Sequence, residues 1–214
     1  QACKKIGWEL GSIDGILYDL GLSTFQLKEE KKGFSFEDDV PMDMRMDERL
    51  SVTANDLIIG LSEGELARLL SRFGEEPQAK SFAKAIKEAV AKSSDHLTAR
   101  QIAKVIKNAS RYSKSRIHPA TRVFQALRIA VNSELDNLQF SLTRATLLLK
   151  PTGRLVIISF HSLEDKIAKN LAKSPDLELV NGKPIVPREE EVSKNPSSRS
   201  AKMRVYQKLV SEKI

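Results

Sequence analysis

The sequence lacks several features that would assign it to a class of protein at once. It has one cysteine, Cys3, in 214 residues, which excludes an internal disulfide framework and a cysteine-cluster metal site. No apolar run approaches the roughly 20 residues of a membrane span. The first residues, QACKK, are polar, unlike a signal peptide, and the sequence does not open with Met. We therefore expect a soluble cytoplasmic protein that is processed, trimmed or a fragment.

Common catalytic motifs are missing as well. The sequence contains neither a G-x-G-x-x-G loop nor a Walker sequence, which disfavours the usual nucleotide-binding loops. The three histidines, His96, His118 and His161, are far apart in sequence, so we expect no metal site. Ser159 and Ser162 flank His161, but without a G-x-S-x-G elbow a serine hydrolase is disfavoured.

Acidic residues are scarce in the second part of the chain. The net charge is +7, but residues 1–95 hold 13 basic and 18 acidic side chains, and residues 96–214 hold 22 basic and 10 acidic. Residues 97–133 contain eight Lys or Arg and no acidic residue. Such a block is typical of a protein that binds a polyanion, since neutralised phosphates release counterions. A solvated helix face is the alternative, and charge by itself does not separate the two.

The first half of the chain reads as a strand, a long loop and a group of helices. Residues 13–21 form a short apolar run that ends in an acidic residue and a glycine, which predicts a buried strand. Residues 21–47 have little periodicity but carry buried-type Phe and Met side chains, which argues against disorder. Capping boxes at residues 62–65 and 98–101 and apolar stripes predict several short helices between 51 and 110.

The second half reads as one long helix followed by strands. Pro119 suits a first helical turn, and apolar residues recur every three or four positions to Leu142. Residues 154–160 predict a buried strand, and Ser162 is placed to cap a helix over 163–172. Residues 177–180 and 202–209 are further strand candidates, with a polar loop at 187–200. This order predicts an α/β fold with a helical insertion.

Polar residues follow two of the predicted strands. Asp19 closes the first strand, and Ser159 and His161 close the second. In open α/β sheets ligands lie outside the carboxyl ends of the strands, so these residues would face one crevice. Asp19 could instead be an ordinary turn residue, and His161 a helix cap or core residue. Arg116, His118, Arg122 and Arg128 at the start of the long helix would suit a phosphate, with a solvated helix end as the alternative.

Seven blocks of the chain resemble, in order, the bacterial RsmH (MraW) family of ribosomal RNA methyltransferases. They are residues 14–27 (DGILYDLGLSTFQL), 33–36 (GFSF), 42–47 (MDMRMD), 73–76 (FGEE), 118–129 (HPATRVFQALRI), 153–165 (GRLVIISFHSLED) and 195–200 (NPSSRS). The resemblance covers nearly the whole chain. It implies a partial Rossmann-like S-adenosylmethionine methyltransferase sheet with an all-helical insert domain. The implied division is 1–46 and 118–214 for the methyltransferase domain and 47–117 for the insert.

The resemblance also implies a reaction and a set of site residues. The reaction is N4-methylation, from S-adenosyl-L-methionine, of a cytidine in the decoding region of small-subunit (16S) rRNA, with the rRNA or a ribosomal particle as partner. Asp19 and Gln26 match the family's cofactor-binding Asp and Gln. From their place at and just past the first strand, rather than from the resemblance, Asp19 and the chain around Leu20–Ser23 are candidates for accepting the amine proton. Ser159 and His161, at the end of the neighbouring strand, are candidates for lining the base pocket. Flanking phosphates would be held by Arg116, His118, Arg122, Arg128 and Arg199.

The chain departs from the family pattern at its beginning. The family opens with a Gly-Gly-His type loop and an acidic residue on the second strand, both of which contact the cofactor, and neither is present. We therefore expect this chain to begin near the family's fourth strand, without roughly the first third. A non-catalytic RNA-binding fragment is the alternative function, and a scaffold whose helical insert contacts protein is a third.

Overall fold

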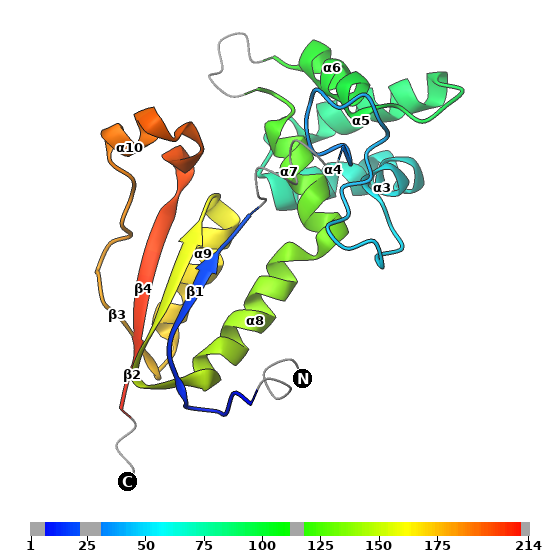
Figure 1. The fold of residues 1–214 in the computed structure, drawn as a ribbon. Coiled ribbons are helices and arrows are strands. Elements are labelled where there is room, and N and C mark those ends of the chain that lie inside the picture. Colours follow the sequence, from blue (N-terminus) through cyan, green and yellow to red (C-terminus); the bar gives the residue numbers. More distant parts are fainter. Residues whose placement is uncertain (1–6, 22–30, 112–117, 211–214) are drawn as a thin grey trace. The chain divides into compact units, whose positions relative to one another are not determined.

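The computed structural model describes residues 7–21, 31–111 and 118–210. The chain folds as two compact units: one combines Gln1–Gly21 with Leu135–Ile214, and the other is Leu22–Glu134. We name them the sheet unit and the α3–α7 unit after their elements (Figure 1). In sequence, the α3–α7 unit lies between the two stretches of the sheet unit. The insert bounds at residues 47 and 117 stay a prediction.

The sheet unit is built on a mixed sheet. Among the described residues the strand order is β1-β2-β4-β3, with β1 and β2 parallel and the other pairs antiparallel. The mixed α/β class is thereby confirmed, as are the positions of the predicted strands, although β2 begins at Leu149 rather than Arg154. Their predicted burial is wrong: no residue of β1 is buried, and from Gly153 on β2 buries only alternate residues, because one face of the sheet stays open. The strands are β1 (Ile13–Asp19), β2 (Leu149–Ser159), β3 (Leu177–Leu179) and β4 (Lys202–Lys208).

Two helices cover one face of this sheet. Side chains of α8 (Glu134–Leu148) and α9 (Ser162–Asn170) form one buried cluster with alternate residues of the strands. Tyr206 of β4 is fully buried there, and its hydroxyl donates to the Ala168 carbonyl of α9 at 2.7 Å. The opposite face is more open, since Leu17 of β1 is 63% exposed. The α9 helix is followed by a single 3-10 turn, Leu171–Lys173.

The α3–α7 unit contains a second buried cluster, in which each helix contributes its apolar stripe. Its helices are α3 (Ala54–Gly60), α4 (Glu63–Gly74), α5 (Ala79–Lys92), α6 (Ala99–Ala109) and α7 (Thr121–Asn132). The predicted capping boxes of α4 (Ser62 with Glu65) and α6 (Thr98 with Gln101) are confirmed. A third box, Thr53 with Asp56, begins α3, which the sequence pattern did not single out.

The segment before α3 is packed, as its Phe and Met residues predicted. Phe34, Met42 and Met44 belong to the buried cluster, although the described part of this segment has neither helix nor named strand. Gly33 has φ +77°, and a Cβ there would lie 2.7 Å from the Met42 Cα, so a glycine is required. The segment before α3 is therefore held in place by its buried side chains and by the close approach of Gly33 to Met42, rather than by regular secondary structure.

Three further predictions of local structure were wrong. The long helix is two helices, because Ser133 adopts a left-handed conformation (φ 48°) between α7 and α8. The N-cap of α9 is His161, and Ser162 is the first helical residue. The polar loop at 187–200 contains α10 (Glu189–Lys194), whose first turn holds three glutamates that suit a helix N-terminus, and a 3-10 turn, Pro196–Ser200. In the described ranges no helix is long and apolar enough to cross a membrane.

Candidate functional site

The carboxyl ends of β1 and β2 meet at one edge of the sheet. The two strands are parallel, Asp19 is in register with Ile158, and the Leu20 N–H donates to the Ile158 carbonyl at 3.1 Å. Directly afterwards Gly21 takes a left-handed φ of +99°. The predicted proximity of the two strand ends is thus present, and the edge is formed within the sheet unit.

Asp19 presents its side chain to solvent at this edge. It is exposed, and its carboxylate has no hydrogen-bond or ion-pair partner among the described residues. Because side chains alternate along a strand, Asp19 shares a face with Ile158, whereas Ser159 belongs to the opposite face. An exposed carboxylate at a strand end can accept hydrogen bonds from a hydroxyl or ammonium group of a ligand.

Ser159 is committed to the interior of the sheet unit. It is 1% exposed, and its hydroxyl donates to the Lys202 carbonyl of β4 at 3.3 Å. Its neighbours on the same face, Leu155 and Ile157, are fully buried in the cluster under α8 and α9. In this arrangement the Ser159 hydroxyl supports the β2–β4 pairing at the strand end.

His161 and Glu164 begin α9 together. The Glu164 N–H lies 3.4 Å from His161 Nδ1, and the Glu164 carboxylate accepts from the His161 N–H at 3.3 Å, which makes a reciprocal capping box. The same carboxylate also accepts from the Phe160 N–H at 2.8 Å. The His161 Nε2 is 3.2 Å from Glu164 Oε1, and both side chains are largely buried. The structure therefore gives His161 a capping role, which was the alternative considered for it.

Glu164 and Asp165 were not identified from the sequence. Asp165 lies 2.7 Å from Arg204 Nε and 3.2 Å from Lys202 Nζ, which joins α9 to β4. Burial by itself would raise the pKa of Asp165, but the hydrogen bonds from Arg204 and Lys202 outweigh it and hold the pKa below its ordinary value. His161 and Glu164 are three residues apart, which is the spacing of a capping box, and this spacing could have revealed their pairing from the sequence.

His118 lies at the start of α7. Its Nδ1 accepts from the Ala120 N–H at 3.2 Å, and its ring stacks on Phe36 with centroids 4.7 Å apart. Burial first, and the charge of Lys107 second, lower the pKa of His118. Both causes favour the neutral form of the ring, in keeping with an Nδ1 that accepts from the Ala120 N–H.

The predicted arginines differ in what surrounds them. Arg128 pairs with Glu134 through Nε–Oε1 and Nη2–Oε2, both at 2.8 Å, with side chains 17% and 15% exposed. Arg122 is exposed and reaches the Glu75 carbonyl at 3.4 Å, and Arg199 is exposed within the 3-10 turn. Ser23, Gln26 and Arg116 lie outside the described residues. The phosphate-binding roles of these residues stay predictions.

The architecture and the strand-end site define a mixed α/β protein whose parallel strand pair is connected through a separate folded unit. Comparison with known proteins specifies this class further: the sequence model of the MraW methylase family matches residues 1–209. The chain belongs to the MraW methylase family.

Relatives carry the name "Ribosomal RNA small subunit methyltransferase H". The chain is 43% identical to that of Syntrophotalea carbinolica, with 94% of this chain and 70% of the relative covered. It is 49% identical to that of Gloeothece citriformis (92% and 65%) and 42% identical to that of Dehalococcoides mccartyi (97% and 63%). The chain thus spans about two thirds of the length of these relatives.

Proposed function

We propose that this chain takes part in S-adenosylmethionine-dependent N4-methylation of a cytidine in the decoding region of small-subunit (16S) rRNA, in the cytoplasm. The observation that carries the proposal is the exposed Asp19 carboxylate at the shared end of β1 and β2, in a chain that matches the methylase family over residues 1–209. Ligands of open α/β sheets bind at such strand ends. The partner would be the rRNA or a ribosomal particle.

The residues at this edge fit the proposed cofactor in their chemistry. S-adenosylmethionine offers hydroxyl and ammonium donors, and it supplies an electrophilic methyl group for in-line displacement. Asp19 is an exposed acceptor, and Gly21 in its left-handed conformation turns the chain directly behind it. Asp19 would hold the cofactor by accepting from one of these donors, and Gln26, outside the described residues, would be its second contact.

A second role for Asp19 concerns the cytosine amine. The amine lone pair is delocalised into the ring, so an acceptor at its N–H would localise the pair and take the proton. Asp19 could serve as that acceptor, with Ser23 as the other candidate. We favour the cofactor role, because Asp19 matches the cofactor-binding Asp of the family and one carboxylate is not expected to serve both.

The base would have to be unstacked to reach this edge, as for other enzymes that modify a base. The proposed pocket residues are Ser159, the last residue of β2, and His161, which follows the strand at the N-cap of α9. Because Ser159 is 1% exposed and bonded to Lys202, its hydroxyl fits a supporting position better than contact with the base. His161, at the N-cap of α9, would line the pocket while it keeps the capping bond.

The test compares two aspartates of β1 in a chain that also carries the N-terminal strands of the family, which we call the full-length protein. Asp19→Ala removes the proposed acceptor, whereas Asp14→Ala, at the opposite end of the strand, removes an exposed partner of Lys150. We expect Asp19→Ala to weaken S-adenosylmethionine binding about 10- to 100-fold, the value of one charged hydrogen bond, and Asp14→Ala to leave it within about twofold. Calorimetry and methyl transfer from labelled cofactor to rRNA measure the two effects. Equal cofactor affinity and turnover in Asp19→Ala and the unmodified protein would refute the assignment.

RNA binding without catalysis is the second candidate, favoured by the basic block at residues 97–133. Calorimetry of residues 1–214 with S-adenosylmethionine separates the two, since the family's glycine-rich cofactor loop is not in this sequence. We expect weak or no cofactor binding by residues 1–214 and binding by the full-length protein. Tight binding by residues 1–214 would contradict the position given to the cofactor site.

A further inference from the structure

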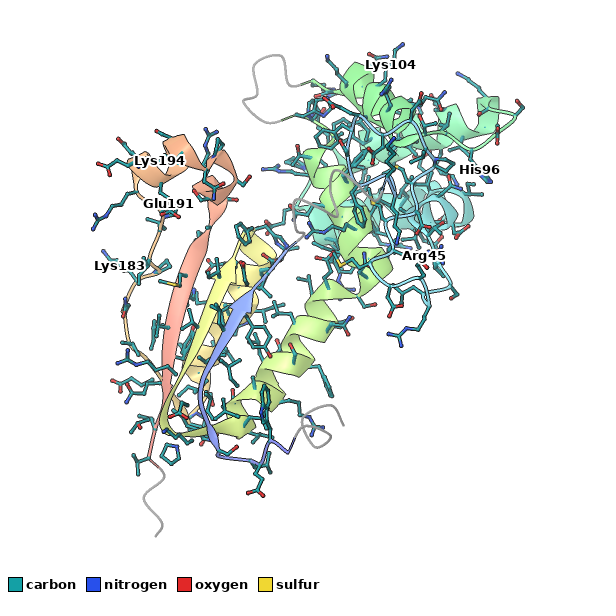
Figure 2. All side chains as sticks on the ribbon, in the orientation of Figure 1. Arg45, His96, Lys104, Lys183, Glu191 and Lys194 are labelled. Carbon is teal, nitrogen blue, oxygen red and sulfur yellow. The ribbon has the colours of Figure 1, made fainter. Side chains whose placement is uncertain are left out.

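The exposed side of α6 is basic along its length. Arg100, Lys104 and Lys107 follow each other at spacings of four and three residues, which places them on one side of a helix. The opposite side, with Ile102 and Ile106, is buried in the cluster and fixes this orientation. Figure 2 shows Lys104 on the outer side of α6. The helix therefore turns a row of cations outward.

Two hydrogen bonds connect the end of α6 and the start of α7 to the turn between α4 and α5. The Arg111 N–H donates to Gln78 Oε1 at 3.1 Å, and Arg122 Nη1 donates to the Glu75 carbonyl at 3.4 Å. The end of α6, the turn between α4 and α5 and the start of α7 thus form one surface. We name its exposed cations, Lys104, Lys107, Arg111 and Arg122, the α6–α7 basic surface.

These four cations are not neutralised by ion pairs. In the part of the chain that the structure describes, no carboxylate lies within ion-pair distance of any of them, whereas Arg128 and Lys84 each have an acidic partner. The turn contributes Glu75 and the buried Glu76, which leaves the surface positive. Arg100 is not included, because it bonds the Glu37 carbonyl in an acidic loop at the other end of α6.

The chemistry of this surface favours a phosphate backbone over other partners. Protein interfaces have an apolar or aromatic centre, and membrane-binding helices insert apolar side chains. The large exposed apolar side chains of the α3–α7 unit are Val52 and Ile59, at α3, and none belongs to the α6–α7 basic surface, among the residues described. Exposed cations that follow one another along a helix, without apolar neighbours, are typical of proteins that contact successive phosphates.

We propose that Lys104, Lys107, Arg111 and Arg122 bind phosphates of the rRNA, so that the α3–α7 unit holds substrate through its own surface. The inference rests on the proposed function for the identity of the RNA. It assigns a role to Lys104, Lys107 and Arg111, which the sequence analysis included only as unnamed members of the basic block 97–133. It also distinguishes two predicted arginines: Arg122 is exposed on this surface, whereas Arg128 is paired with Glu134.

The experiment removes three charges from the full-length protein. The triple variant Lys104→Gln/Lys107→Gln/Arg111→Gln is compared with Arg68→Gln/Lys84→Gln/Lys92→Gln, which removes three exposed cations of α4 and α5. With about 0.7 to 0.9 counterions released per phosphate contact, we expect the first variant to bind rRNA roughly 50- to 150-fold more weakly at 0.15 M salt. Its plot of log affinity against log salt should be less steep by about 2 to 3, and the control should change far less. Thermal unfolding establishes that both variants are folded.

Each outcome has a separate meaning. Equal losses in the two triple variants, or an unchanged salt slope in the first, would overturn the proposed surface. If the unmodified protein methylates rRNA and the first variant keeps the same KM for rRNA, the surface is wrong and the proposed function stands. If no methylation occurs but the first variant still loses RNA affinity, the function is wrong and the surface stands. Binding of phosphatidylserine vesicles in preference to RNA, abolished by the first variant, would instead indicate a membrane partner.

Discussion

The side-chain amide of Asn132, at the end of α7, donates to the main-chain carbonyl of Met44 at 2.7 Å, although the two residues are 88 positions apart. Its Oδ1 accepts from the Met46 N–H at 2.8 Å, so this one side-chain amide bonds the main chain on both sides of Arg45. Met44 is 1% exposed and has a left-handed φ of 58°, a conformation that is unfavourable for its side chain. Asn132 therefore holds the strained segment 42–47 against α7.

We expect Asn132→Ala to destabilise the α3–α7 unit. The substitution removes the partner of the buried Met44 carbonyl and of the part-buried Met46 N–H, at a cost of about 2 to 4 kcal/mol in the free energy of unfolding. Urea denaturation followed by far-UV circular dichroism measures the change. The matched control is Asn108→Ala on the exposed side of α6, expected to stay within about 0.5 kcal/mol. Equal stabilities of the two variants would show that the loop does not depend on this amide.

Local features of this fold could be predicted because their partners are close in sequence. The capping boxes at Ser62 and Thr98 each join residues three positions apart, and the apolar run of β2 needs no distant partner to be recognised. The position of Asp19 at a strand end followed from the same kind of signal. Asp19 was expected near the end of β2 because the ligand site of an open α/β sheet lies at the carboxyl ends of its strands.

Features that depend on distant partners could not be predicted. The break at Ser133 interrupts a continuous apolar periodicity, and it is accompanied by the contacts of Asn132 to a loop that precedes it by more than 80 residues. The pairing of Asp165 with β4 likewise depends on a strand 39 residues later. At the candidate site, the side of the sheet on which Ser159 lies was set by strand alternation and register, which the composition of the motif does not reveal.

The Arg128–Glu134 pair spans the break between α7 and α8 and yields a second prediction. Both side chains are mostly buried, so Arg128→Gln leaves a carboxylate without its bidentate partner and should lower the free energy of unfolding by about 2 to 4 kcal/mol. The double variant Arg128→Gln/Glu134→Gln should regain at least half of that loss, as urea denaturation would measure. RNA titrations decide between the two roles of Arg128. A weakened salt dependence of RNA affinity in a variant of unchanged stability would assign it to phosphate and contradict the structural role.

Stability at acid pH should report the contact of Asp165 with Arg204 and Lys202. Despite burial, which opposes it, the bonds from these two cations hold the pKa of Asp165 below its ordinary value. A carboxyl whose folded pKa is depressed contributes stability that is complete above the unfolded pKa, about 3.9, and is lost as pH falls through the folded value. Asp165→Asn should therefore lower the free energy of unfolding at pH 7 by about 2 to 4 kcal/mol, since Arg204 stays buried without its charge partner.

Below about pH 4 the free energy of unfolding of Asp165→Asn should also depend less on pH than that of the unmodified protein. The reason is that the variant has no carboxyl group at position 165 to be protonated. The single tryptophan, Trp8, belongs to the sheet unit, so its fluorescence during urea denaturation follows the unit in which Asp165 lies. Asp176→Asn, an exposed position in the same unit, serves as control and should reproduce the unmodified pH profile. If the profiles of Asp165→Asn and the unmodified protein run parallel from pH 7 into the acid range, the ionised form of Asp165 does not stabilise the fold.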